Sequence, residues 1–298
     1  MTNSVGFALL LALLAGLSTG IGSIIAYFIR QPKSVHMSLI LGFSAGVMIY
    51  VSFIELLHTS LDNIGFLRSN IGFFAGIALI ALLDVLIPHE YKHEDVGHLA
   101  SLLKRRKVQS RLEEPVGTKG INEPSSFERG RHGKMKGAPA FVKSKQQSYL
   151  MRTGVLIAIG IAIHNLPEGL VVFSSGLAGD TSFGILVAVA IAIHNIPEGI
   201  SVSIPIMQAT GNRKMAFIYS FGAGLVEPIG ALIGYAILAP FLTETLIYAM
   251  MAFAAGVMVY ISLDEILPTA HMFGEEHLVI LGTILGMIVM ALSIYIIL

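Results

Sequence analysis

The chain lacks cysteine and tryptophan, and only 13% of its 298 residues are charged. Soluble domains carry about 25% charged residues. The low charge, together with 54% hydrophobic residues and a mean hydropathy of +0.77, therefore indicates a membrane protein. Without cysteine there is no disulfide framework and no thiolate metal site, so any metal must be held by histidine, carboxylate or amide groups. The formal net charge is zero, and we expect no nucleic-acid partner.

Apolar runs long enough to cross a bilayer, about 20 residues each, occur eight times along the chain. They cover residues 4–29, 36–58, 70–88, 151–173, 184–207, 215–239, 245–267 and 278–298. We therefore predict an all-α integral membrane protein with eight transmembrane helices in contact with the lipid bilayer. The first run is too long for the core of a signal peptide and has no basic residue before it, so we expect it to remain as a helix.

Between the third and fourth runs lies a polar stretch, residues 89–150, rich in Lys, Arg, Glu, Gly, Ser and Pro. This composition predicts a largely disordered loop between helices 1–3 (1–88) and helices 4–8 (151–298) of one membrane domain. Its basic residues, and those of the short connections near Arg30 and Arg213, fall on one side of the predicted topology. Because cytoplasmic loops carry such an excess, we expect a cytoplasmic loop and extracytoplasmic termini, with the protein in the cell membrane.

The sequence HNxPEG occurs twice, at 164–169 and 194–199, each time inside a predicted membrane helix. In each copy the His lies four positions, and the Asn three positions, before the Glu, so the three side chains share one helical face. These residues are His164, Asn165, Glu168, His194, Asn195 and Glu198. A charged group at the centre of the bilayer costs about 2.5–3.5 kcal/mol on insertion scales. Two copies of so costly a cluster indicate a transport or catalytic site rather than packing.

The side chains of this cluster offer nitrogen and oxygen ligands and no soft donor. Such a set suits Zn²⁺ and also Fe²⁺, Mn²⁺, Co²⁺ or Cd²⁺. Glu227, which precedes Pro228, is the only charged residue of the sixth run and a further candidate ligand. We expect the metal to be a transported substrate, with no resident cofactor.

Two pairs of segments in the chain are similar to each other. Residues 157–170 match 187–200, and residues 43–60 match 253–270. Each pair joins an odd-numbered with an even-numbered helix, so the copies cross the membrane in opposite directions. The pattern predicts inverted internal repeats that relate helices 1–3 to 6–8 and helix 4 to helix 5, with the site near the bilayer midplane.

Two other groups of polar residues each allow two interpretations. Carboxylates near the predicted ends of helices 2 and 7 are either solvated at the membrane interface or help to admit and release metal: Glu55, Asp264 and Glu265. Imidazoles at the start of the polar loop form either a low-affinity metal-capturing segment or part of a solvated linker: His89, His93 and His98.

The paired HNxPEG motifs in adjacent helices, followed by the Glu-Pro of helix 6, resemble the ZIP (Zrt/Irt-like) metal transporters, and most of all their bacterial ZupT branch. The resemblance covers all eight runs and leaves out the polar loop. It implies a binuclear site in which two glutamates, Glu168 and Glu198, bridge the metals. One ion would be completed by His164 and His194, and the other by Asn165, Asn195 and Glu227. The resemblance also implies import into the cytoplasm, an elevator-like motion and, often, a homodimer.

We therefore expect an importer of divalent metal, of zinc and also of iron, manganese, cobalt or cadmium, with its site between helices 4 and 5. The alternative from another class is an intramembrane zinc-dependent metalloenzyme, because His and Glu on one face could activate water. Hydrolytic HExxH motifs need a Glu beside the first His, and Asn165 and Asn195 stand there instead. The motif thus favours a transporter over an enzyme.

Overall fold

The computed structural model describes residues 2–28, 34–87, 140–177, 181–238 and 243–297. All regular structure within these ranges is helical. Its elements are α1 (Thr2–Phe28), α2 (Ser34–Val51), η1 (Ser52–Leu57), α3 (His58–Ile64), α4 (Phe66–Leu86), α6 (Ala140–Leu177), α7 (Thr181–Thr210), α8 (Arg213–Gly224), α9 (Val226–Ile233), η2 (Gly234–Leu238), α10 (Glu244–Ile261), η3 (Ser262–Ile266), α11 (Leu267–Met272) and α12 (Glu276–Ile297). Eight spans of the described chain are long and apolar enough to cross a membrane, which confirms the predicted fold class.

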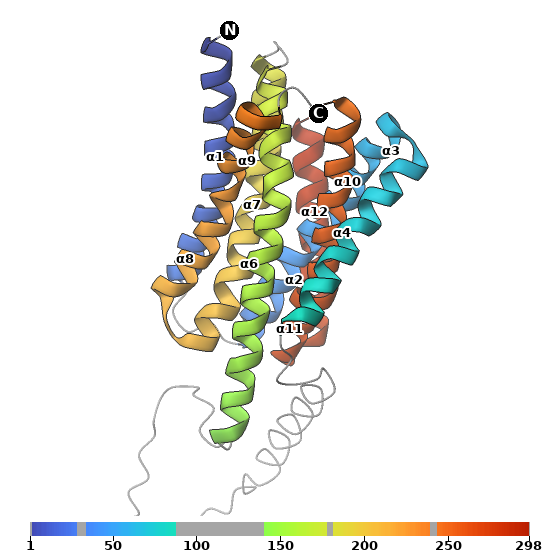
Figure 1. Cartoon of the computed structure of the whole chain (residues 1–298). Helices are drawn as coiled ribbons and strands as arrows, with labels where there is room; N and C mark the ends of the chain where they lie inside the picture. The colour runs from blue at the N-terminus through green and yellow to red at the C-terminus, as the bar shows by residue number, and fades with distance from the viewer. Residues whose placement is uncertain (1, 29–33, 88–139, 178–180, 239–242, 298) are drawn as a thin grey trace, which may run out of the picture.

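The helices pack as two groups (Figure 1). The first, which we call the site bundle, contains α1, α6, α7, α8 and α9. The second, the outer bundle, contains α2, α3, α4, α10, α11 and α12 with the π-helical turns η1 and η3. In the site bundle α1 packs along α7, α6 and α8, whereas in the outer bundle α2 packs on α12 and α4 packs on α10. The two bundles meet mainly where α6 touches α10 and where α7 touches α2.

Within the outer bundle, glycines let helix backbones touch each other. Gly46 of α2 lies against the carbonyl oxygen of Thr283 in α12, and Gly256 of α10 lies against that of Phe73 in α4, so that an added Cβ would collide with either oxygen. Small residues at helix crossings are the usual way in which membrane helices approach closely. Gly46 and Gly256 are 210 positions apart, and so are the two residues they touch, Phe73 and Thr283. The similar segments 43–60 and 253–270 have the same spacing.

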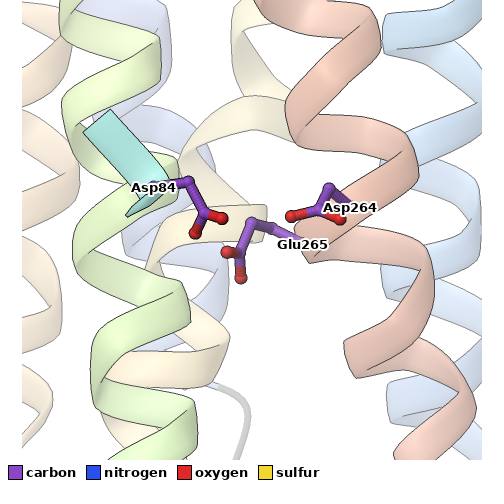
Figure 2. A group of neighbouring side chains, drawn as sticks. All are labelled: Asp84, Asp264 and Glu265. Carbon is purple, nitrogen blue, oxygen red and sulfur yellow. The ribbon is translucent and has the colours of Figure 1, made fainter. Parts of the chain in front are cut away.

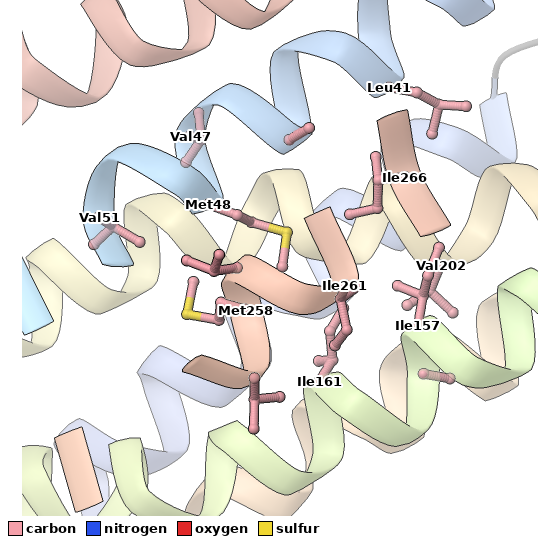
Figure 3. Packing of buried hydrophobic residues seen from close by; sticks show 14 of the residues in the cluster. Leu41, Val47, Met48, Val51, Ile157, Ile161, Val202, Met258, Ile261 and Ile266 are labelled. Atoms are coloured by element: carbon pink, nitrogen blue, oxygen red, sulfur yellow. The ribbon is translucent and has the colours of Figure 1, made fainter. Parts of the chain in front are cut away.

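The contact between α6 and α10, where the two bundles meet, is formed largely by apolar side chains instead (Figure 3). Ile157 and Ile161 of α6 belong to one buried cluster with Met258 and Ile261 of α10. Gly160 of α6, which faces the same neighbour, would meet the end of the Ile261 side chain rather than backbone. Flexible side chains can change rotamer when one helix slides on another, whereas interlocked backbones cannot. The interface between the bundles is therefore easier to deform than the bundles themselves.

Two boundaries differ from those predicted from the sequence. Helix α6 begins at Ala140, so residues 140–150 of the predicted loop are helical and extend the membrane helix beyond its apolar part. The sixth span is not continuous, because it is divided at Leu225 between α8 and α9. Pro228 contributes to this break, because its ring disfavours the position over the carbonyl of residue 224 but is tolerated in the first turn of a new helix. Proline alone does not enforce a break, since α6 and α7 continue through Pro167 and Pro197.

The π-helical turns at Ser52–Leu57 and Ser262–Ile266 were not predicted. They lie in the two similar segments, 43–60 and 253–270, at nearly the same position of each. A π-helical turn inserts one extra residue into a helix and often marks a functional site. Hydrophobic periodicity gives no signal for such an insertion over so few residues. The predicted metal-capturing residues of the polar loop, His89, His93 and His98, lie outside the described residues.

The close approach of α10 and α4 can be tested at Gly256. We expect Gly256→Ala to destabilise the protein by about 1–3 kcal/mol, because the new methyl group must push α10 away from the Phe73 carbonyl. Thermal unfolding in detergent, followed by size-exclusion chromatography, should show a lower midpoint. The matched control is Gly222→Ala in α8, since nothing lies within 4 Å of a Cβ added at Gly222. An unchanged midpoint for Gly256→Ala would contradict the backbone contact.

Candidate metal site

Helices α6 and α7 bring the two HNxPEG copies face to face. The Nε2 atom of His164 lies 3.0 Å from Oε1 of Glu198, and the Nε2 atom of His194 lies 3.4 Å from Oε1 of Glu168. Each histidine therefore contacts the glutamate of the opposite helix. All four side chains are 1% exposed or less. The two motifs thus form a single, fully enclosed cluster.

The two asparagines are held from outside the cluster by backbone carbonyls. Nδ2 of Asn165 donates to the carbonyl oxygen of Ala223 in α8 at 3.1 Å, and Nδ2 of Asn195 donates to that of Ala15 in α1, also at 3.1 Å. Nδ2 of Asn195 also lies 2.7 Å from Oε2 of Glu227. Because the amide nitrogens are occupied as donors, the amide oxygens remain available as acceptors.

Many acceptor atoms of this cluster have no hydrogen-bond donor within the described ranges. They are Oδ1 of Asn165 and Asn195, both carboxylate oxygens of Glu168, Oε2 of Glu198, Oε1 of Glu227 and the Nδ1 atoms of His164 and His194. A buried acceptor left unsatisfied costs about 1–3 kcal/mol, and neighbouring buried carboxylates also repel each other. A divalent cation would satisfy several of these oxygens at once and compensate their charge. The donor set therefore fits a metal ion.

Glu227 enters the cluster because the sixth span is interrupted. It lies in the first turn of α9, directly after the break at Leu225, and is fully buried. The free backbone N–H groups at the start of a helix favour a negative charge there. The break therefore both directs this carboxylate to Asn195 and reduces the cost of burying it.

Glu55 lies at the edge of the cluster although it belongs to the outer bundle. It occupies the π-helical turn η1 and is close enough to His194 and Glu168 for direct electrostatic interaction. Its Oε2 atom is buried and has no hydrogen-bond donor among the described residues. The role of Glu55 in metal entry or exit stays a prediction, with which the burial of this oxygen is consistent.

Asp264 and Glu265 do not reach this cluster. They lie with Asp84 of α4 in a second group, in which the carboxylate oxygens are within 4.8 Å of one another (Figure 2). Sequence reasoning missed Asp84, although a lone acidic residue near the end of an apolar run was a usable signal. In contrast to the first cluster, this group contains its own cation.

That cation is Arg152 of α6. Its guanidinium group pairs with the Asp84 carboxylate, donates to the Asp84 carbonyl oxygen at 3.1 Å, and lies 3.3 Å from Oε1 of Glu265. Thr153 donates its hydroxyl to Oε2 of Glu265 at 2.7 Å. Since α6 belongs to the site bundle while α4 and η3 belong to the outer bundle, this ion-pair group connects the two bundles at their interface.

Comparison with known proteins gives a consistent result. The family model for the ZIP zinc transporter matches residues 87–294. The chain is 47% identical to the zinc transporter ZupT of Clostridium perfringens, over 98% of this chain and 96% of that protein. It is 44% identical to the ZupT protein of Nitratidesulfovibrio vulgaris, over 95% and 94% of the two chains, and 42% identical to that of Streptococcus mutans, over 98% of each.

The role of Arg152 as a compensating charge can be tested by removing it. We expect Arg152→Met to destabilise the protein by about 3 kcal/mol, because it removes the cation that pairs with Asp84 and Glu265, two largely buried carboxylates. Adding Asp84→Asn and Glu265→Gln to this variant should recover most of the loss, as judged by thermal unfolding in detergent. A further loss in the triple variant would show that the carboxylates are stabilised by something other than Arg152.

Proposed function

The chain belongs to the ZIP zinc transporter family, and from this premise we propose that it imports zinc into the cytoplasm through the cluster between α6 and α7. Membership of the family and the eight apolar spans make it a multi-pass membrane protein that transports metal. The proposal concerns which side chains bind the metal, which metals are transported and in which direction they move.

The observation that carries this proposal is the set of unpaired acceptors at the centre of the site bundle. Carboxylate, amide and imidazole atoms from α6, α7 and α9 converge there with no donor among the described residues and with almost no exposure. A purely structural polar cluster would be expected to satisfy its own hydrogen bonds. Acceptors that lack donors are suited to binding a cation that arrives and leaves.

Within the cluster we assign two ions. Glu168 and Glu198 bridge them, one ion being completed by the two histidines and the other by Asn165, Asn195 and Glu227. The crosswise contacts of His164 with Glu198 and of His194 with Glu168 support this assignment, because they bring each glutamate within reach of both helices. Oxygen and imidazole ligands accommodate Zn²⁺ and also Fe²⁺, Mn²⁺, Co²⁺ and Cd²⁺. The ions are substrates and not resident cofactors.

Transport would occur by displacement of the site bundle relative to the outer bundle. Three observations support this. Glycines let backbone meet backbone within each bundle, and the α6–α10 contact between the bundles is formed largely by apolar side chains, with one ion-pair group around Arg152. The contacts of Gly46 and Gly256 recur at the spacing expected for an inverted repeat. A displacement of this kind exchanges side-chain contacts without unfolding either bundle.

We propose that metal moves from outside the cell to the cytoplasm. α1 starts and α12 ends at one end of the molecule, whereas α4 ends and α6 starts at the other end (Figure 1). The ends of α4 and α6 between which the basic segment stands in the sequence therefore lie on the side opposite the termini. By the positive-inside rule that side is cytoplasmic in the cell membrane. Family membership also favours transport over the alternative of an intramembrane metalloenzyme.

The bridging glutamates provide the test of this function. We expect the double variant Glu168→Ala, Glu198→Ala to lose zinc uptake into proteoliposomes, because both bridging carboxylates are then gone and Glu227 alone cannot compensate the charge of two divalent ions. Glu244→Ala, at the exposed start of α10, is the control and should transport as the wild type does. Zinc uptake by a correctly inserted double variant would refute the assignment of the site.

The histidines provide a second test, of metal preference. We expect His194→Asn to reduce zinc uptake more than manganese uptake, because imidazole nitrogen favours zinc whereas an amide oxygen suits the harder ion. Competition between the two metals in the same proteoliposomes measures the ratio directly. An equal loss for both metals, or a loss confined to manganese, would show that His194 does not set the preference.

A further inference from the structure

The site bundle has an internal correspondence between α1 and the span α8–α9, the helices 1 and 6 of the predicted inverted repeat, for which the sequence showed no residue-level match. Four positions of α1 make the same contacts as the four positions of α8 and α9 that lie 208 residues later in the chain. They are residues 15, 16, 19 and 22 in α1 and residues 223, 224, 227 and 230 in α8 and α9. Asn195 donates to the Ala15 carbonyl as Asn165 donates to that of Ala223. Gly22 lies against the carbonyl of residue 196, as Gly230 lies against that of residue 166.

This correspondence pairs Thr19 with Glu227. Gly199 lies against the Thr19 carbonyl just as Gly169 lies against the Glu227 carbonyl. Their side chains also begin at equivalent places. A Cβ added at Gly16 would come within 3.3 Å of the Glu227 Cβ, and one added at Gly224 within 2.7 Å of the Thr19 Cβ. By this correspondence, the position of Thr19 relative to Asn165 is equivalent to that of Glu227 relative to Asn195, whose Nδ2 lies 2.7 Å from Oε2 of Glu227.

The hydroxyl of Thr19 is fully buried and has no hydrogen-bond partner in the described chain. Hydroxyls in membrane helices usually donate to the carbonyl four residues earlier, as Ser23 does to Thr19 at 3.0 Å and Ser52 does to Met48 at 2.6 Å. For Thr19 that carbonyl is the one of Ala15, which already accepts the amide of Asn195. The hydroxyl lies instead beside Gly224, the residue next to the anchor of Asn165.

We propose that Thr19 is a further oxygen donor of the metal site, whose hydroxyl holds a water molecule bound to the ion between the two asparagines. This rests on the proposed function. The Glu227 carboxylate is attached two carbon atoms further from the backbone than the Thr19 hydroxyl, so a water fills the difference in reach. Thr19 and Glu227 then flank this ion from opposite sides, one neutral and one charged.

The water completes the coordination of the ion. Asn165, Asn195, Glu168, Glu198 and Glu227 supply five oxygen ligands in the proposed site, and the water held by Thr19 is the sixth. Manganese prefers six oxygen ligands, whereas zinc is satisfied by four ligands. Thr19 should therefore matter for manganese and much less for zinc.

The test replaces Thr19 by Val, which has nearly the same shape and no hydroxyl. We expect the apparent KM for manganese uptake into proteoliposomes to rise about ten-fold, the effect of one lost hydrogen bond near a charged group, while the KM for zinc stays close to that of the wild type. Thr19→Ser should restore the wild-type behaviour because it restores the hydroxyl. The control is Thr269→Val in α11, an equally buried threonine of the outer bundle, which should change neither KM.

Zinc uptake by the same preparation shows that the Thr19→Val variant is folded. If Thr19→Val does not insert into the membrane, Thr19→Ala is used in its place. An unchanged manganese KM in Thr19→Val, or an equal rise for both metals that Ser does not reverse, would overturn the inference. Either result leaves the proposed function intact if Glu168→Ala, Glu198→Ala still abolishes uptake. Uptake that survives this double variant would instead overturn the proposed function itself.

Discussion

The structure depends on one constraint, namely that polar groups inside a membrane must be satisfied by protein atoms or by a bound ion. The chain places two carboxylates, two imidazoles and two amides at the contact of α6 and α7, where no side chain is more than 1% exposed. Protein partners satisfy the outward-facing atoms: backbone carbonyls of α1 and α8 hold the asparagine nitrogens. Within this cluster, most of the atoms that have no hydrogen-bond partner among the described residues are acceptors. A cation is the partner that would satisfy them.

One kind of helix contact holds the site in a fixed shape, and another kind allows the site to move. Where Gly22, Gly169, Gly199 and Gly230 cross neighbouring helices, backbone meets backbone, and the ligands of the site bundle are fixed relative to each other. Where α6 meets α10, isoleucine and methionine side chains meet instead. Dispersion forces between such side chains are individually small and are replaced by similar ones after a displacement. The ion pairs of Arg152 with Asp84 and Glu265, and the hydrogen bond of Thr153 to Glu265, are polar links across that interface, so a displacement there has to exchange or break them.

Hydropathy and helical periodicity were sufficient to predict the eight spans and the shared face of His, Asn and Glu in each motif, because both depend only on local sequence. The break at Leu225 was accessible for the same reason, since Pro228 marks it. The π-helical turns, the helical residues 140–150 and the group around Asp84 were not predicted. Each depends on what lies opposite in space: Asp84 becomes significant only when α6 places Arg152 beside it. Thr19 shows this most clearly, because nothing in the sequence marks a threonine in an apolar helix as a functional residue. Its role is suggested only by its structural correspondence to Glu227.

The correspondence between α1 and α8–α9 preserves backbone contacts more strictly than side chains. Glycines and asparagine anchors recur at the shift of 208, whereas Thr19 and Glu227 differ in length and charge. The same is true of the outer bundle, where the glycine contacts recur at 210 but Ile54 stands opposite Asp264. Backbone contacts set the distances between helices, and a protein that is to present one site to two sides of a membrane needs those distances to be alike in both halves. The ion, in contrast, has to enter from one side and leave at the other, and this direction can come only from the side chains that differ.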